Sequence, residues 1–161
     1  MTVPAVGPVS SEMQQRYAHA AADGIAGAAA TTCARIVDLR GNTGGTMYPM
    51  LTGLATLLPN GTAMTFRTRE AVDIADDGAG IDDVVVPIEG MPKVAGQPIA
   101  VLQDGDTASS GEAVLTAFRG LDNVRSFGSD SAGYSSANSV HPLYDGVRLV
   151  LTTKCVRRPG W

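Results

Sequence analysis

Two short stretches of this chain contain residues whose types and spacing could carry out chemistry. The first is GDTASSGEAVLTAF, residues 105–118, where serines stand between an apolar strand pattern at 98–103 and a helical pattern. A strand, a tight polar turn and a helix that begins with serines would expose a hydroxyl beside unpaired N–H groups, which can hold a developing oxyanion. The same residues also fit an ordinary helix start, with Thr107, Ser109 or Ser110 as the N-cap and Glu112 closing a capping box on Ser109. Taken alone, this stretch favours the ordinary helix start.

The second stretch is RIVDLRGNTGG, residues 35–45, a short apolar strand that ends in a glycine-rich loop. Paired glycines allow positive φ and close backbone approach, so that their amides can point at a substrate carbonyl. Asp38, Arg40 and Asn42 can bond such a loop into a fixed shape. The alternative is a turn that only reverses the chain. A phosphate-binding loop is excluded, because neither a Gly-Lys-Ser/Thr ending nor a full GxGxxG is present.

DLRGNTGG followed some sixty residues later by TASSGE resembles the tail-specific (carboxy-terminal processing) serine peptidases. Residues 49–62 and 120–153 are most similar to a membrane-anchored branch of that family, which inactivates a lantibiotic. The resemblance runs from about Met13 to Thr153. It implies an α/β fold with a ClpP/crotonase-like core, in which a mixed sheet is flanked by helices. It also implies one protease core domain over residues 1–161, cropped at both ends, that cleaves peptides near their C-terminal tail.

Applied position by position, the resemblance makes Ser109 the nucleophile, because the family serine stands three residues before a glutamate, here Glu112. Ser110 is the alternative if the register shifts by one residue. The amides of Gly44 and Ser110 would form the oxyanion hole, and Glu112 would anchor the helix start. The residues that would support the glycine-rich loop are Asp38, Arg40, Asn42 and Gly45. No metal or organic cofactor is implied.

A serine hydroxyl is a poor nucleophile without a base within hydrogen-bond reach, and the expected base is missing. Members of the family with a lysine base carry it about 25 residues after the serine, where this chain has Tyr134. Other members use a histidine from a segment well before the DLRGN motif, which would lie upstream of Met1. Of the two histidines present, His19 is expected on the surface of a helix and His141 on a strand. Two alternatives stay open: a non-catalytic module that binds peptides or other ligands, and a chain that is inactive without its histidine.

Composition limits the partners of the chain. Its 161 residues fit one domain, and a net charge of −4 gives no indication of a nucleic-acid partner. No apolar run approaches the roughly 18 residues of a membrane span, and no signal-peptide pattern is present. A membrane anchor or export signal would therefore lie outside this chain, and the resemblance implies an extracytoplasmic or membrane-associated protein. Cys33 and Cys155 lack metal-ligand spacing and are expected to be buried reduced thiols, with a disulfide as the alternative.

The expected elements follow from hydrophobic periodicity. Helices are predicted from Ser11 to about Ala30 and over 46–58. Strands are predicted near 35–40, 62–68, 98–103, 124–128, 138–143 and 147–153, with a hairpin turn at Asp145-Gly146. Residues 69–96 are the least regular region, with a short strand at 84–87 and aspartates at 73, 76, 77, 82 and 83. A solvated loop is the default there, and attraction of a cationic peptide or weak calcium binding are the alternatives.

Overall fold

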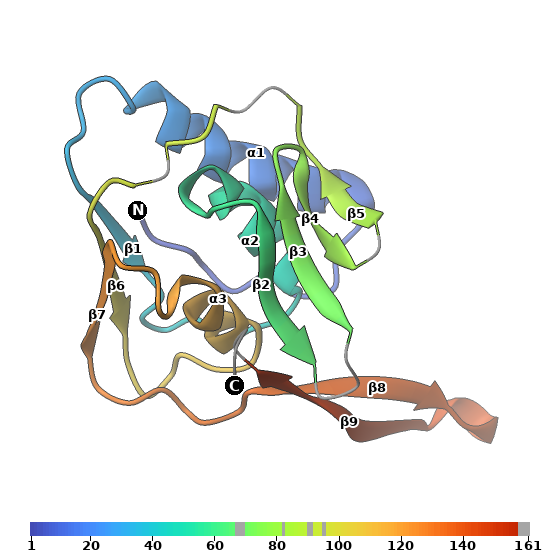
Figure 1. Cartoon of the computed structure of the whole chain (residues 1–161). Coiled ribbons are helices and arrows are strands. Elements are labelled where there is room, and N and C mark those ends of the chain that lie inside the picture. Colours follow the sequence, from blue (N-terminus) through green and yellow to red (C-terminus); the bar gives the residue numbers. More distant parts are fainter. Residues whose placement is uncertain (67–69, 82, 90–91, 95, 158–161) are drawn as a thin grey trace.

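The structure is a computed structural model that describes residues 1–66, 70–81, 83–89, 92–94 and 96–157. Its strands form two sheets (Figure 1). The first is parallel, with β1 (Arg35–Asp38), β6 (Ile99–Gln103) and β7 (Val124–Gly128) in the order β1-β6-β7. The second is antiparallel, in the order β5-β4-β3-β2-β9-β8. Its strands are β2 (Gly61–Phe66), β3 (Ala71–Ala75), β4 (Gly78–Ile81), β5 (Asp83–Pro87), β8 (Ser136–Pro142) and β9 (Arg148–Arg157).

Three α-helices are found in the described part of the chain: α1 (Ser11–Gly27), α2 (Met47–Leu54) and α3 (Ser110–Phe118). Two short 3-10 turns complete the elements, η1 (Ala55–Leu57) after α2 and η2 (Tyr144–Gly146) between β8 and β9. Helices α2 and α3 lie between the two sheets, and the β8–β9 hairpin extends away from the body (Figure 1). The apolar core is therefore built from both sheets and from the helices between them. Its members include Val37, Leu39, Met50, Leu54, Met64, Ile74, Val101, Val114 and Phe118.

The N-terminal segment runs beside β1 and continues the parallel sheet. Val3 N donates to Asp38 O at 2.9 Å, and Asp38 N donates to Met1 O at 2.9 Å. Further along, Thr46 N donates to Val6 O at 2.7 Å. Gly45 has φ +116°, and a Cβ on it would lie 1.9 Å from Val6 O, so only glycine fits at this position. The first residues of the chain thus hold the glycine-rich loop from one side.

The prediction of an α/β fold is confirmed, but the parallel and antiparallel strands form two separate sheets rather than one mixed sheet. Residues 69–96 are more regular than predicted, because β3, β4 and β5 form consecutive antiparallel pairs there. Buried Thr52 of α2 explains part of this order, since its Oγ1 accepts from Ala79 N and donates to Val86 O, each at 3.1 Å. The side chain of Thr52 thus bonds β4 and β5 at the point where their pairing shifts register, between Ala79 and Gly80.

The predicted acidic loop is also ordered by local pairs. Asp73 accepts a hydrogen bond from Thr62 Oγ1 at 2.7 Å, and Asp76 accepts one from Asn60 Nδ2 at 2.9 Å. These two hydrogen bonds thus join the start of β2 to the end of β3, at the end of the strand pair away from its connection. Asp82 lies outside the described residues, as does the side chain of Asp83.

The prediction of buried cysteines is wrong. Cys33 and Cys155 are both exposed free thiols. Cys33 lies in the connection between α1 and β1. Cys155 lies on β9 opposite Ser136, on a hairpin that is largely exposed. Free cysteines are commonly buried, but a connecting loop and an exposed hairpin offer no core in which to bury these two.

Close packing of α1 against α2 requires a glycine. A Cβ on Gly53 would lie 2.8 Å from Ala21 Cβ and 3.1 Å from Ala18 O, whereas one on Gly24 would meet no atom within 4 Å. We expect Gly53→Ala to lower the free energy of unfolding by about 1–3 kcal/mol, because the helices must separate. Gly24→Ala should raise it by about 0.5–1 kcal/mol, because alanine is the better helix former. Urea unfolding of both variants measures these changes, and equal effects of the two would contradict this account.

Candidate active site

The glycine-rich loop, residues 38–45, and the TASSGE turn, residues 107–112, lie against each other. They follow β1 and β6, which are adjacent parallel strands, so both emerge at the same edge of the sheet. Ala108 N donates to Asn42 O at 2.9 Å, and Thr107 Oγ1 donates to Leu39 O at 2.9 Å. Ser110 Oγ donates to Gly45 O at 2.6 Å. The tertiary structure thus brings together the two motifs that the sequence separates.

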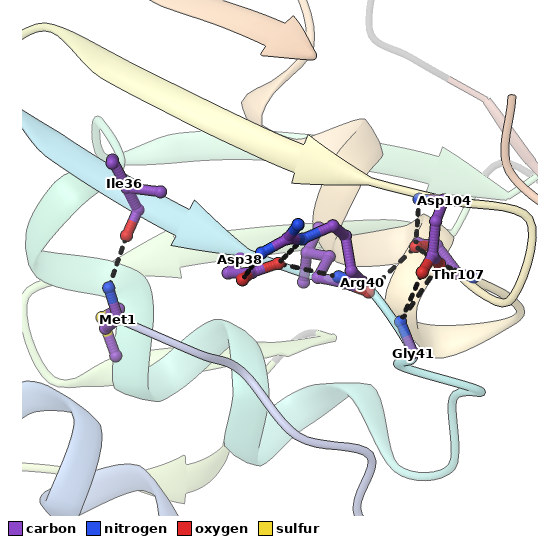
Figure 2. A network of polar contacts seen from close by, with 8 residues as sticks. Met1, Ile36, Asp38, Arg40, Gly41, Asp104 and Thr107 are labelled. Carbon is purple, nitrogen blue, oxygen red and sulfur yellow. Dashed lines mark hydrogen bonds and ion pairs between the residues drawn. The ribbon is translucent and has the colours of Figure 1, made fainter. Parts of the chain in front are cut away.

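Asp104 connects the two loops through its carboxylate (Figure 2). Gly41 N donates to Oδ1 at 3.0 Å and to Oδ2 at 3.2 Å. The amides of Asp106 and Thr107 each donate to Oδ1 at 3.1 Å. These bonds, above all the one from Gly41 N, lower the pKa of Asp104. Asp104 was not predicted as a site residue. Its position could have indicated this role, because an aspartate between a strand and a polar turn commonly accepts hydrogen bonds from the amides of that turn.

Asp38 and Arg40 stabilise the entry to the glycine-rich loop. Arg40 Nη2 lies 2.7 Å from Asp38 Oδ2, and Arg40 Nε donates to Asp38 Oδ1 at 2.9 Å (Figure 2). This bidentate pair lowers the pKa of Asp38 to about 2. The Arg40 side chain is 57 % exposed and that of Asp38 is 19 % exposed, so the pair stabilises the loop close to the surface.

Asn42 is fully buried and binds three parts of the chain at once. Its Nδ2 donates to Val3 O at 2.8 Å, and its Oδ1 accepts from Gly44 N at 2.9 Å. Its backbone oxygen accepts from Ala108, as described above. A Cβ on Gly111 would lie 2.7 Å from that oxygen, which explains why the helix begins Ser-Gly rather than with a larger second residue. Asn42 therefore sets the distance between the loop and the start of α3.

Ser109 occupies a strained backbone conformation at the turn between β6 and α3. Its φ of +51° and ψ of −115° are rare for a residue with a side chain and cost about 1–3 kcal/mol. Such a sharp strand-to-helix turn presents a serine hydroxyl at its apex. Ser109 is half-buried and lines a cleft of about 470 Å³ together with Gly45, Ser110 and residues of β8 and β9.

Glu112 holds this turn from the helix side. The carboxylate is 5 % exposed; Oε2 accepts from Ser109 N at 3.0 Å. Oε1 accepts from Ser131 Oγ at 2.7 Å and from Gly133 N at 2.9 Å. Glu112 thus joins the serine turn to the loop that follows β7. All its contacts are with fixed donors, which suits an anchor of the helix start.

Backbone amides surround the serine. Ser110 N has no acceptor among the described residues, so it is available to a ligand. The backbone of Gly44 is close by, since a Cβ on it would lie 2.7 Å from Ser109 Cβ and 3.0 Å from Ser110 N. The amide of Gly44, however, donates to Asn42 Oδ1, so binding of an oxyanion there requires this bond to be shared or broken. The amide of Gly45 has no acceptor among the described residues, and it was not predicted as a donor.

No described imidazole or amine makes a hydrogen bond with Ser109 Oγ. His19 on α1 and His141 on β8 are both exposed, and neither lines the cleft. Tyr134, which stands at the position of a family lysine base, is 68 % exposed. Lys154 of β9 does line the cleft and was not predicted, because the alternating pattern of residues 147–153 gives no indication of what the strand faces.

An α/β fold with a strained serine at a strand-to-helix turn beside a glycine-rich loop is an arrangement found in serine hydrolases. Comparison with known families is more specific, because the profile of peptidase family S41 matches residues 9–160. The chain belongs to this family. The predicted resemblance is thereby confirmed.

Individual relatives agree with this assignment. The nisin-resistance protein of Lactococcus lactis subsp. lactis is 43% identical over 126 residues, which are 76% of this chain and 40% of that protein. A lipoprotein from Streptococcus agalactiae has a TM-score of 0.81 and 32% identity over 98% of this chain and 55% of its own. The photosystem II D1 C-terminal processing protease shares the fold, with a TM-score of 0.57 and 22% identity over 91% of this chain and 34% of its own. The chain thus spans about half or less of the length of these relatives. Across the described residues, no helix is long and apolar enough to cross a membrane.

The Asp104 junction makes a prediction about pH. Because folding depresses the pKa of Asp104 from 3.8, its carboxylate stabilises the fold above that value and stops doing so as the pH falls through the lower folded-state pKa. We expect Asp104→Asn to lower the urea midpoint at pH 7, and the difference from the parent protein to shrink below pH about 3.8. Asp106→Asn is the control, since that side chain makes no bond to a described residue. A pH-independent difference for Asp104→Asn would contradict the role of its charge.

Proposed function

We propose that this chain is the catalytic core of a serine peptidase that cleaves peptides close to their C-terminal tail, with Ser109 as the nucleophile. The observation that carries the proposal is the positive φ of Ser109 at the start of α3, directly beside the Gly44 backbone. Ser109 Oγ would attack the scissile carbonyl carbon and pass its proton to a base. The base would return that proton to the leaving amine, and water would then hydrolyse the acyl-enzyme.

The amides of Ser110 and Gly44 are the proposed oxyanion donors. An oxyanion donor is worth roughly 3–4 kcal/mol of barrier lowering in other acyl-transfer enzymes. Ser110 N supports this role because it points from the first turn of α3 and has no described acceptor. Gly44 N would exchange Asn42 Oδ1 for the stronger, charged acceptor that forms in the transition state.

The general base is proposed to come from outside the described residues. The resemblance implies a histidine from a segment that precedes the glycine-rich motif in the full-length protein. The absence of a described base at Ser109 favours a second candidate, a non-catalytic module that binds peptides on the same scaffold. The labelling experiment below separates the two.

A lantibiotic is the substrate that the relatives favour, since the nisin-resistance protein is 43% identical to this chain. Similarity to a lipoprotein supports an extracytoplasmic or membrane-associated location for the full-length protein. The expected partner is therefore a peptide outside the cytoplasm. Any attachment to the membrane would use an anchor outside the described helices.

Substitution of the two serines tests the nucleophile. In the full-length protein, a serine-directed fluorophosphonate should label Ser109, and Ser109→Ala should abolish both labelling and cleavage of nisin. Ser110→Ala is the matched control, because it removes only the hydrogen bond to Gly45 O; it should keep labelling and lose about 1 kcal/mol of stability. Mass spectrometry of the labelled peptide measures the outcome. Labelling at Ser110 would mean that Ser110, not Ser109, is the nucleophile. No labelling of either serine would favour the binding module.

Alanine at Gly44 tests the oxyanion hole. The added methyl would enter the space between Ser109 Cβ and Ser110 N, so we expect the labelling rate to fall by roughly 10²-fold or more. Gly41→Ala is the control: Gly41 also has a positive φ, +70°, but a Cβ there meets no atom within 4 Å. Both variants place an alanine at a positive φ, and only the alanine at position 44 would crowd Ser109 and Ser110. Equal labelling rates in folded samples of both would contradict the role of Gly44.

A further inference from the structure

We propose that Lys154 binds the C-terminal carboxylate of the substrate, an inference that rests on the proposed peptidase function. Lys154 lies on β9 and lines the same cleft as Ser109. Among the described residues that line this cleft, Lys154 is the only one with a charge; the others are one glycine, apolar side chains, hydroxyls and one amide. Its ion-pair partner Glu70 is not among the lining residues, so an anion in the cleft would share the amine with that carboxylate.

Contacts on two sides fix the position of the amine. Lys154 Nζ forms an ion pair with Glu70 and lies 5.4 Å from the centroid of the Phe66 ring. The lysine side chain is 28 % exposed and that of Glu70 is 42 % exposed. An ammonium has three N–H donors, and Glu70 is its one acceptor among the described residues. Donors therefore remain for a ligand.

The same contacts argue against Lys154 as the base. The amine of Lys154 donates to Glu70, and among the described residues it makes no hydrogen bond with Ser109 Oγ, which a base would need. The chain has one other lysine, Lys93, whose amine donates to Ala55 O at 2.9 Å and to Leu58 O at 3.3 Å. That lysine supports the backbone after α2, whereas Lys154 faces a cleft.

The size of the cleft indicates which anion it would receive. A volume of about 470 Å³ suits a small-molecule-sized ligand, so it would hold only a short piece of peptide beyond the scissile bond. For a peptidase that acts close to a C terminus, this piece ends in the α-carboxylate. Tyr48 also lines the cleft, and its hydroxyl makes no hydrogen bond to a described residue, so it is available to the ligand. The substrate class is then a linear tail with a free carboxylate.

The test compares nisin with nisin amidated at its C-terminal carboxylate, using the full-length protein. We expect kcat/KM to be about tenfold higher for the free acid, the ratio that one charged hydrogen bond of about 1.4 kcal/mol supplies. Lys154→Met should reduce this ratio to about one, mainly through KM, because the contact is remote from the reacting atoms. Lys154→Arg should keep the preference, and Glu70→Gln should keep or increase it, since a competing carboxylate is removed.

Binding of both peptides to the Ser109→Ala protein provides a readout that needs no catalysis. The free acid should bind about tenfold more tightly, and this difference should disappear in the Ser109→Ala, Lys154→Met double variant. Equal cleavage and binding of the two peptides would overturn the role of Lys154 and leave the peptidase function intact. Binding that prefers the free acid without any cleavage would support the site and overturn the peptidase function. Neither binding nor cleavage of either peptide would overturn both.

Discussion

The junction between the glycine-rich loop and the serine turn is the contact on which the rest of the site depends. Two neighbouring parallel strands end at the same edge, and Asp104 and buried Asn42 join the loops that follow them. Each side chain satisfies several backbone groups that neither strand nor helix can pair. Around buried Asn42 and Thr107, part of the energy that holds the loops together is the avoided cost of leaving buried polar groups without partners.

This junction also sustains the strain at Ser109. A positive φ in a residue with a Cβ persists only where the surroundings over-determine it, and here Ala108, Ser109 and Ser110 each have a fixed bond. Glu112 adds a second anchor that reaches the loop after β7. The hydroxyl and amides are consequently held in place before any substrate arrives, which is the condition for electrostatic stabilisation of a transition state.

Two sheets with different roles explain the shape of the cleft. The parallel sheet and α3 supply the serine, whereas β8 and β9 of the antiparallel sheet supply the opposite wall. In the proposed function, a peptide bound in the cleft would meet both Ser109 and Lys154. The proposed functions of reaction and recognition thus fall on different layers, so one wall can change without disturbing the strained turn on the other.

Local patterns determined much of this protein from the sequence alone. Apolar runs and turn residues predicted the strands near 35–40 and 98–103 and the helix after Ser109, because periodicity and helix-start chemistry act over a few residues. The α/β class was implied by the family resemblance. The motifs also indicated the serine and the glycine-rich loop. Only the tertiary structure decided that Asp104 and Glu112 each bond segments far apart in the chain, and that Thr52 of α2 bonds β4. It also decided that both cysteines are exposed and that Lys154 lines the same cleft as Ser109. Those facts depend on which layers pack together, and a periodic pattern shows that a face exists without showing what covers it.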